Sequence, residues 1–166
     1  MRDALIGLGA NLGDALGTLR AALAELRRLP GCRLLRVSSS YRSAPVDASG
    51  PDYCNAVVLI SSALPAHELL AALQRIELAH GRVRPPGQRH APRTLDLDLL
   101  WVDGVRLDAP QLTLPHPRMH LRAFVLAPLA EIAPHWRLDD GEPAAAAARR
   151  LSAQGQRISR GEALLR

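Results

Sequence analysis

The sequence predicts an α+β fold, and three observations lead to that prediction. First, two segments with leucines at helical spacing separate β-type apolar segments at residues 4–9, 32–41, 53–61 and 95–101. Second, the order along the chain is strand, helix, strand, strand, helix, strand. Third, 166 residues with 48% hydrophobic and 22% charged residues suit one globular domain over residues 1–166.

The first strand, at residues 4–9, runs into a glycine-rich turn. The glycine spacing nearly matches a dinucleotide-binding fingerprint but misses its last glycine by one position. No acidic residue ends a second strand about twenty residues later, so a Rossmann fold is disfavoured. Asp14 can cap the following helix, whose apolar positions keep helical spacing until Pro30.

The second strand is expected at residues 32–41 and the third at 53–61, with a long loop between them. This loop is rich in residues that break regular structure, which is typical of a functional or mobile segment. Asn55 stands at the mouth of the third strand. Taken alone, it is best interpreted as a turn residue that bonds local backbone.

A second helix is expected to begin near Pro65 and to end near Gly81. Gln74 and Glu77 lie three residues apart and share one face, where ordinary solvated side chains are the default interpretation. The next segment, 82–93, carries four arginines among prolines and a glycine, which predicts a basic loop. Such a loop is usually just solvated, but one that leads into two carboxylates is typical of a phosphate clamp.

The segment 93–101 carries the strongest chemical signal. Successive side chains of a strand point to opposite faces, so Asp96 and Asp98 share one face, and the other takes Leu95, Leu97, Leu99 and Trp101. The Cα atoms of the two aspartates would lie about 6.5–7 Å apart, which lets both carboxylates bind a pair of metal ions about 3.5–4 Å apart. The alternative is the polar side of an edge strand. Metal binding is favoured over it, because Asp is depleted in strands and like charges on one face repel.

The remainder of the chain gives weaker signals. An Asp-Gly pair at 103–104 predicts a hairpin. His116 follows in a loop, where a locally hydrogen-bonded side chain and a phosphate contact are equally supported. Helices are expected at 121–132 and 142–151, and 152–166 is expected to form a polar, loosely held tail.

Composition limits the partners. The net charge of +5 favours a polyanionic partner, either nucleic acid or the phosphates of a nucleotide. The chain has one Phe, two Trp and two Tyr, and no basic strand carries the aromatic platforms of common RNA-binding surfaces. The apolar runs are far shorter than a membrane span and no secretory leader is visible, so we expect a protein of the cytoplasm. Cys32 and Cys54 form no CxxC pair and are interpreted as reduced core residues.

Five motifs follow one another in a fixed order: Gly-Ala-Asn-Leu-Gly at 9–13, Pro-Asp-Tyr-Cys-Asn-Ala at 51–56, Gln-Arg-Ile-Glu at 74–77, Ala-Pro-Arg-Thr-Leu-Asp-Leu-Asp at 91–98, and Leu-Pro-His-Pro-Arg-Met at 114–119. Over residues 4–135 this series resembles the 6-hydroxymethyl-7,8-dihydropterin pyrophosphokinase family of folate biosynthesis. The resemblance implies a ferredoxin-like α/β sandwich, a mainly antiparallel sheet with helices packed on it.

The resemblance also implies an activity. The β,γ-pyrophosphoryl group of ATP would move to the hydroxymethyl oxygen of 6-hydroxymethyl-7,8-dihydropterin, with release of AMP. Asp96 and Asp98 would hold two Mg²⁺ ions that bridge the ATP phosphates. ATP and the pterin would be the partners of an expected monomer that binds neither nucleic acid nor a membrane.

The resemblance assigns roles residue by residue. The catalytic residues would be Arg84, Arg93, Asp96, Asp98 and Arg122. ATP would be bound by Gln74, Glu77, Arg84, Arg93, Leu99, Thr113 and His116. Asn55 would read the pterin amide edge with help from backbone groups of Ser43, Ala44 and Val46, and the ring would lie between Tyr53 and Phe124.

Three positions depart from the pattern of some relatives: Gln111 replaces an arginine that binds phosphate, Leu121 replaces Glu, and His90 replaces Trp. The segment 82–93 also looks one residue longer than in some relatives. Two other functions remain open. A non-catalytic basic module would bind RNA through the arginines of 82–93 without needing the aspartates. A metal-dependent nucleotidyltransferase would use the aspartates but release pyrophosphate.

Overall fold

The computed structural model describes residues 1–45, 50–81 and 94–165. Its elements follow in the order β1 (Arg2–Ala10), α1 (Ala15–Arg27), β2 (Cys32–Val37), β3 (Ser39–Ser43), β4 (Tyr53–Ser62), α2 (Ala66–Ala79), β5 (Asp96–Val102), β6 (Leu107–Asp108), β7 (Thr113–Leu114), the 3₁₀ turn η1 (Met119–Leu121), α3 (Ala123–Ile132), α4 (Ala144–Ala153) and β8 (Ile158–Ala163). Apart from a division of the second strand, the first elements occur in the predicted order.

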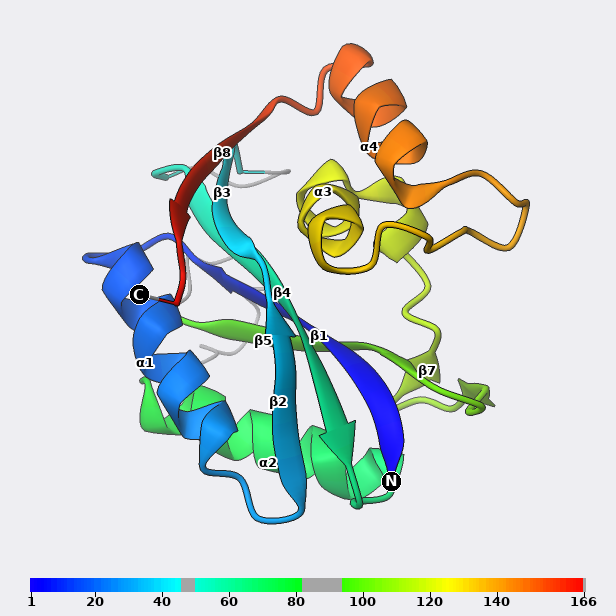
Figure 1. Ribbon diagram of the computed structural model, residues 1–166. Coiled ribbons are helices and arrows are strands. Elements are labelled where there is room, and N and C mark those ends of the chain that lie inside the picture. The colour runs from blue at the N-terminus through cyan, green and yellow to red at the C-terminus, as the bar shows by residue number, and fades with distance from the viewer. Residues whose placement is uncertain (46–49, 82–93, 166) are drawn as a thin grey trace.

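The main sheet has six strands in the order β5-β1-β4-β3-β8, and β2 also pairs with β4 (Figure 1). Each of these pairs is antiparallel. β1 lies between β4 and β5, and α1 and α2 pack together on one face of the sheet. This is the ferredoxin-like arrangement, and the prediction of an α+β sandwich is confirmed.

Two hydrophobic clusters lie on opposite faces of the sheet. The first joins α1 and α2 to even-numbered side chains of the central strands, such as Ile6 and Val58. The second joins α3 and α4 to odd-numbered side chains, such as Leu5 and Val57. This division follows from the alternation of side chains along a strand. Odd-numbered residues of β1 and β4 therefore face the α3 side.

The predicted strand 32–41 is two strands. The division falls at Ser38, whose buried hydroxyl accepts a hydrogen bond from the backbone N–H of Val57 at 2.9 Å and donates to the carbonyl of Ser39 at 2.8 Å. A side chain that bonds the backbone in this way competes with the regular ladder. β3 then continues along β4 and places Tyr41 opposite Asn55.

A β-bulge in β5 corrects one predicted orientation. Leu5 of β1 pairs with Trp101, but Ile6, the next residue, pairs with Leu99, so Leu100 is an extra residue in β5. The bulge changes the alternation. Leu97 and Leu99 lie in the α1/α2 cluster, whereas Leu100 and Trp101 pack on the α3/α4 side. The expectation that Trp101 shares the face of the preceding leucines was wrong.

Two further expectations for the C-terminal half need correction. The turn at 103–104 forms, but the chain does not fold back onto β5, because β6 pairs with β7 instead. The tail is not loosely held, since β8 pairs with β3 at the edge of the sheet. The Arg20 side chain donates to the carbonyls of Ala163 and Leu164 at 3.0 and 3.3 Å, and Ser40 Oγ donates to that of Glu162 at 2.8 Å.

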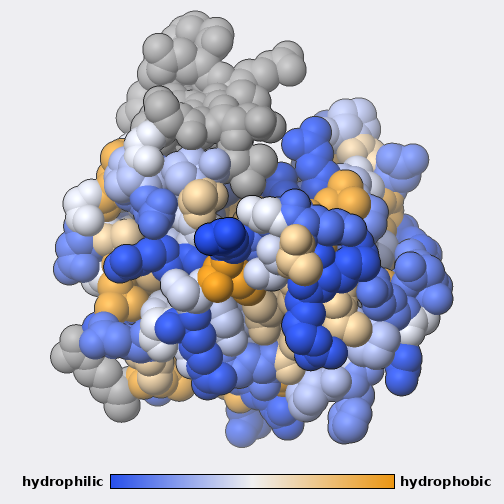
Figure 2. Space-filling model, turned by 90° about the horizontal axis from the view of Figure 1, so that it is seen from above, coloured by the Kyte–Doolittle hydropathy of each residue, from blue (hydrophilic) through white to orange (hydrophobic). Residues whose placement is uncertain are grey.

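The described residues include no helix that has both the length and the apolar character needed to cross a membrane. From above, most of the visible surface is hydrophilic, with apolar side chains in small patches (Figure 2).

Candidate active site

A row of four residues crosses the sheet. Strand pairing places Asp96 of β5 opposite Gly9 of β1, Gly9 opposite Asn55 of β4, and Asn55 opposite Tyr41 of β3. Residues directly opposite in antiparallel strands point to the same face. That face is the α3 side, because Val57, two residues beyond Asn55, packs in the α3/α4 cluster.

The two aspartates lie at the start of β5. Asp96 pairs with Gly9 and Asp98 with Gly7, and both aspartates are half-buried. They share one face, as the alternation predicted. A Cβ at Gly7 would meet Leu100 Cδ1 at 3.5 Å, so Leu100 covers Gly7. Because both carboxylates lie on one face and are only half-buried, they can bind one cation together.

Gly9 leaves one side-chain position of this row empty. A Cβ at Gly9 would lie 3.4 Å from Asn55 Oδ1 and 4.0 Å from Tyr53 Cδ1. The space above Gly9 is thus bordered by Asp96 on one side and by an amide and an aromatic ring on the other. We call the side-chain position that Gly9 leaves empty the Gly9 hollow.

Asn55 presents its amide to the Gly9 hollow. Its side chain is buried, with 5% of the residue exposed, and Nδ2 donates to Ser43 Oγ at 2.7 Å. The oxygen is the amide atom nearest to Gly9. Asn55 is therefore a fixed residue within β4, not a turn residue. Ser43 was predicted to act through its backbone, but its side chain holds the amide, and Ala44 is exposed at the end of β3.

Tyr41 closes the far end of the row. Its hydroxyl donates to Glu131 Oε1 of α3 at 2.8 Å, and the same carboxylate accepts bonds from the backbone N–H and the hydroxyl of Ser39 and from Arg160. Burial and the neighbouring Glu131 raise the pKa of Tyr41 to about 12, so it stays a neutral donor. Glu131 thereby ties α3 to β3 beside Asn55.

The bulge in β5 also positions His116. The backbone N–H of His116 donates to the carbonyl of the bulged Leu100 at 2.7 Å, and Nδ1 accepts from the backbone N–H of Arg118 at 3.1 Å. Burial, with the charges of Arg122 and Arg118, lowers the pKa of His116 to about 4, although Asp96 opposes this shift. The imidazole is thus neutral at pH 7, and its proton lies on Nε2, where it can be donated to an anion.

Arg122 and Phe124 lie together where α3 begins. Arg122 is the N-cap residue, and its guanidinium carbon lies 5.5 Å from the centroid of the Phe124 ring. Phe124 packs partly against the α3/α4 cluster. Since Arg122 lowers the pKa of His116 and Asp96 raises it, the four side chains form one group of interacting charges and an aromatic ring.

The residues predicted for the nucleotide side divide into exposed and buried ones. Gln74 is exposed on α2, as its default interpretation predicted, whereas Glu77 is buried, with 3% exposed. Glu77 Oε2 accepts from the backbone N–H of Leu97 at 2.8 Å, so the solvated interpretation was wrong for this residue. Leu99 is buried in the α1/α2 cluster and Thr113 is half-buried in β7. Val46, His90, Arg84 and Arg93 lie outside the described residues.

The donor set fits Mg²⁺. Within residues 1–45, 50–81 and 94–165, no group of three or more His, Cys, Asp or Glu side chains could hold a metal ion. Mg²⁺ usually binds one or two carboxylates together with substrate phosphates and water, not a complete protein cage. Asp96 and Asp98 meet that requirement.

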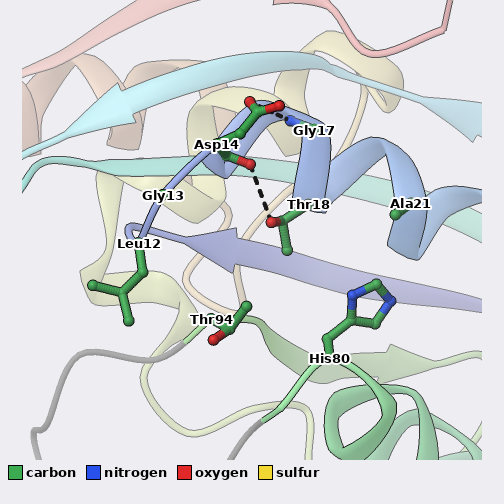
Figure 3. Close-up of a pocket in the computed structure, with 8 residues that line it drawn as sticks. All are labelled: Leu12, Gly13, Asp14, Gly17, Thr18, Ala21, His80 and Thr94. Carbon is green, nitrogen blue, oxygen red and sulfur yellow. Dashed lines mark hydrogen bonds between the residues drawn. The ribbon is translucent and has the colours of Figure 1, made fainter.

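A pocket of about 540 Å³ lies on the other face of the sheet, between the start of α1 and the end of α2 (Figure 3). Of the described residues that line it, none belongs to the predicted site. Asp14 Oδ1 accepts from the backbone N–H of Gly17 at 3.0 Å, as predicted for a helix cap, and Thr18 Oγ donates to the carbonyl of Asp14 at 3.1 Å. These groups serve the helix terminus, so we place the chemistry on the α3 face.

Sequence reasoning missed two contributions to the site. Gly7 and Gly9 were placed in the first strand, as β1 confirms, but their spacing was compared only with a dinucleotide-binding fingerprint; in a strand a glycine allows close approach of another group. Their alternate spacing in an apolar strand was the available signal. The bulge at Leu100 has no such local signal.

Comparison with known proteins identifies the family of this chain. A sequence model described as 7,8-dihydro-6-hydroxymethylpterin-pyrophosphokinase (HPPK) matches residues 5–134. Two relatives are named 2-amino-4-hydroxy-6-hydroxymethyldihydropteridine pyrophosphokinase. The one from Synechocystis sp. is 46% identical to this chain, over 80% of this chain and 67% of the relative. The one from Pseudomonas aeruginosa is 47% identical, over 82% of this chain and 83% of the relative.

The fold is shared with solved structures. A Plasmodium falciparum HPPK-DHPS structure has a TM-score of 0.69 and 13% sequence identity, over 93% of this chain. The chain spans 44% of that protein. Because the family model covers most of the chain and relatives with more than 40% identity match it over most of its length, the chain belongs to the 7,8-dihydro-6-hydroxymethylpterin-pyrophosphokinase family.

Proposed function

We propose that this protein transfers the β,γ-pyrophosphoryl group of ATP to the hydroxymethyl oxygen of 6-hydroxymethyl-7,8-dihydropterin, giving AMP and the pterin diphosphate. The observation that carries the proposal is the row across the α3 face, where an aspartate and a fixed amide border the Gly9 hollow. The printed names of the relatives supply the substrate class.

The pterin would lie in the Gly9 hollow. A flat heteroaromatic ring needs a donor and acceptor at its edge and an apolar surface on its faces. Asn55 offers both hydrogen-bonding functions from one amide, and Ser43 fixes its orientation. Tyr53 borders the hollow and Phe124 begins α3 on the same side of the sheet, so we assign them to the ring faces.

Asp96 and Asp98 would hold two Mg²⁺ ions at the opposite end of the row. When bound, the ions supply charge neutralisation for the phosphates and acidify the attacking hydroxyl. Asn55 of β4 and Asp96 of β5 lie on opposite sides of Gly9. With its amide edge on Asn55, the ring would direct its hydroxymethyl group toward the carboxylates. The sheet thus sets the alignment of the acceptor oxygen and the phosphate chain.

His116 and Arg122 would act on the phosphates of ATP. His116 is neutral at pH 7, and the N–H at Nε2 can donate a hydrogen bond to a phosphate oxygen. A neutral imidazole does not transfer this proton to the phosphate. Arg122 supplies a permanent positive charge to the pyrophosphoryl group in transfer. Arg84 and Arg93 are proposed to grip the remaining phosphate oxygens, and Gln74 and Thr113 to contact the nucleotide. Glu77 and Leu99, which are buried on the α1/α2 side, would support the nucleotide side from beneath β5.

Two alternative functions make different predictions. An RNA-binding module that uses the arginines of 82–93 would bind RNA with an affinity that falls steeply with salt, and it would not need Asp96 or Asp98. A nucleotidyltransferase would attach AMP to the acceptor and release pyrophosphate.

We also propose that the enzyme acts as a monomer in the cytoplasm. Light scattering of the purified protein tests whether it is a monomer.

The product of the reaction tests the proposal. The protein is incubated with Mg²⁺, ATP and the reduced pterin alcohol, and nucleotides and pterins are separated by chromatography. AMP and pterin diphosphate in equal amounts are expected. Release of ADP, or of pyrophosphate with AMP attached to the acceptor, contradicts the proposed function.

A further inference from the structure

The side chain of Gln156 binds the backbone on both sides of Arg122. Its Oε1 accepts from the backbone N–H of Ala123 at 2.9 Å, and its Nε2 donates to the carbonyl of Leu121 at 2.8 Å. We propose that Gln156 is a positioning residue that fixes Arg122 for the reaction, an inference that rests on the proposed function. We call this pair of hydrogen bonds the Gln156 clamp.

The clamp supplies a hydrogen-bond acceptor to the free backbone N–H of Ala123 at the start of α3. The N-cap position favours Ser, Thr, Asp or Asn, whose side chains accept from the first free backbone N–H groups. Here the N-cap residue is Arg122, whose side chain makes no capping bond among the described residues. Gln156 supplies the missing acceptor from a distant part of the chain. The position can therefore carry an arginine, whose guanidinium is left for other contacts.

Gln156 is itself held by the end of α4. Gly155 has a φ of +111°, its N–H donates to the carbonyl of Ser152 at 3.1 Å, and the N–H of Gln156 donates to that of Leu151 at 3.0 Å. These two bonds form a Schellman motif, in which the residue after the glycine usually makes an apolar contact with the helix. A glutamine at this position breaks the local rule. Such exceptions tend to occur where a side chain has another task.

The two helices that carry the clamp pack directly on each other. The buried face of α4 consists of Ala144, Ala147, Ala148 and Leu151, which share a cluster with the buried residues of α3. The small alanine side chains allow close approach of the two helices. The base of Gln156 is thus fixed relative to the helix that it caps, and a short amide side chain spans the remaining distance.

The consequence falls on Arg122 because it lies between the two clamped backbone groups. Its guanidinium lies over the Phe124 ring, which begins the same helix. Without the clamp, Leu121 and Ala123 would each lose a fixed partner. Within the described part of the chain, the backbone at this point would be held only by the bonds of Arg122 itself, from its N–H to Met119 and from the N–H groups of Val125 and Leu126 to its carbonyl. A charge that must meet a transferring phosphoryl group loses effectiveness when its position varies. Gln156 lies outside residues 5–134, which the family model matches.

The experiment is a double-mutant cycle. Gln156→Ala and Arg122→Ala are made singly and together, with Gln154→Ala as a control, since Gln154 is an exposed glutamine at the end of the same helix. Single-turnover rates of AMP formation with saturating Mg-ATP and pterin alcohol are measured, together with KM for each substrate and thermal unfolding. Gln156→Glu is included because it keeps an acceptor for Ala123 and loses the donor to Leu121.

Gln156→Ala is expected to lower the rate about tenfold, as the loss of two backbone hydrogen bonds permits, with KM for ATP unchanged. In the Arg122→Ala background the same change should have no further effect, because the residue through which Gln156 acts is gone. Gln156→Glu should be folded and slow, and Gln154→Ala should match the wild type. Equal losses in both backgrounds, or a wild-type rate in folded Gln156→Glu, overturn the proposal. Absence of AMP formation by the wild type would instead reject the proposed function itself.

Discussion

Replacing Gly9 by Ala tests the location of the pterin. The added methyl group would lie 3.4 Å from Asn55 Oδ1 and 4.0 Å from Tyr53 Cδ1, which are ordinary contacts, so the folded chain can accept it. Gly9 is not among the glycines with positive φ. The substitution should therefore leave the free energy of unfolding unchanged or raise it by about 0.4–1 kcal/mol, because the unfolded chain loses freedom.

The methyl group would occupy the Gly9 hollow, where we place the ring. A bound ring would have to move outward, weakening its contact with one stacking partner, worth about 1–3 kcal/mol, and its hydrogen bond to Asn55, worth about 0.5–1.5 kcal/mol. A net loss of about 2 kcal/mol corresponds to roughly thirtyfold weaker binding of the pterin. Nucleotide affinity should not change, since no nucleotide contact is assigned to Gly9.

The assay is calorimetric titration of each folded variant with the pterin and, separately, with a non-hydrolysable ATP analogue. Gly7→Ala is the matched control, because it adds the same methyl group to the same face of β1 but against Leu100, at 3.5 Å. We expect its pterin affinity to equal that of the wild type. If Gly9→Ala binds the pterin normally, or loses affinity for both ligands equally, the ring does not lie in the Gly9 hollow.

Other predictions concern the charged residues. Asp96→Asn and Asp98→Asn should each abolish most turnover while thermal unfolding shows an intact fold, because each removes a carboxylate from the proposed Mg²⁺ site; near-normal rates at ordinary Mg²⁺ would return the pair to a solvated strand face. The imidazole of His116 should titrate near pH 4 in NMR spectra of the free protein, and a midpoint near 6.5 would contradict its neutral state. Because its folded pKa lies below that of the unfolded chain, stability should fall as the pH drops from 6.5 to 4, and less so in His116→Asn. Glu77→Leu should lower the free energy of unfolding by about 1–3 kcal/mol, since the buried N–H of Leu97 loses its acceptor; an unchanged urea midpoint would show that water replaces the carboxylate.

Features that depend on one segment could be predicted from the sequence. The shared face of Asp96 and Asp98 follows from the geometry of any strand. The capping by Asp14 is also local, because its side chain accepts from the backbone N–H of Gly17, three residues further along the chain. Asn55 gave no such signal, because its importance depends on Ser43 and Gly9 in neighbouring strands. It was found by resemblance alone.

The missed features depend on contacts between distant segments. The bulge at Leu100 contains no glycine or proline to mark it, and it is set by the pairing with β1. The burial of Glu77 depends on the position of β5 over α2, a contact across twenty residues. The strand at Ile158–Ala163 looked like a tail because its residues are polar, as edge strands often are.

The position of β8 at the sheet edge bears on the solubility of the protein. A strand edge with free N–H and C=O groups can pair with another molecule and start aggregation. β8 covers that edge of β3 and exposes charged side chains of its own, Arg160 and Glu162. A fragment cut at the end of the family match, residue 134, would uncover β3 beside Ser43 and Tyr41. We therefore expect a fragment that ends at residue 134 to aggregate more readily than the full sequence, because the segment by which the family is identified does not include the strand that covers β3.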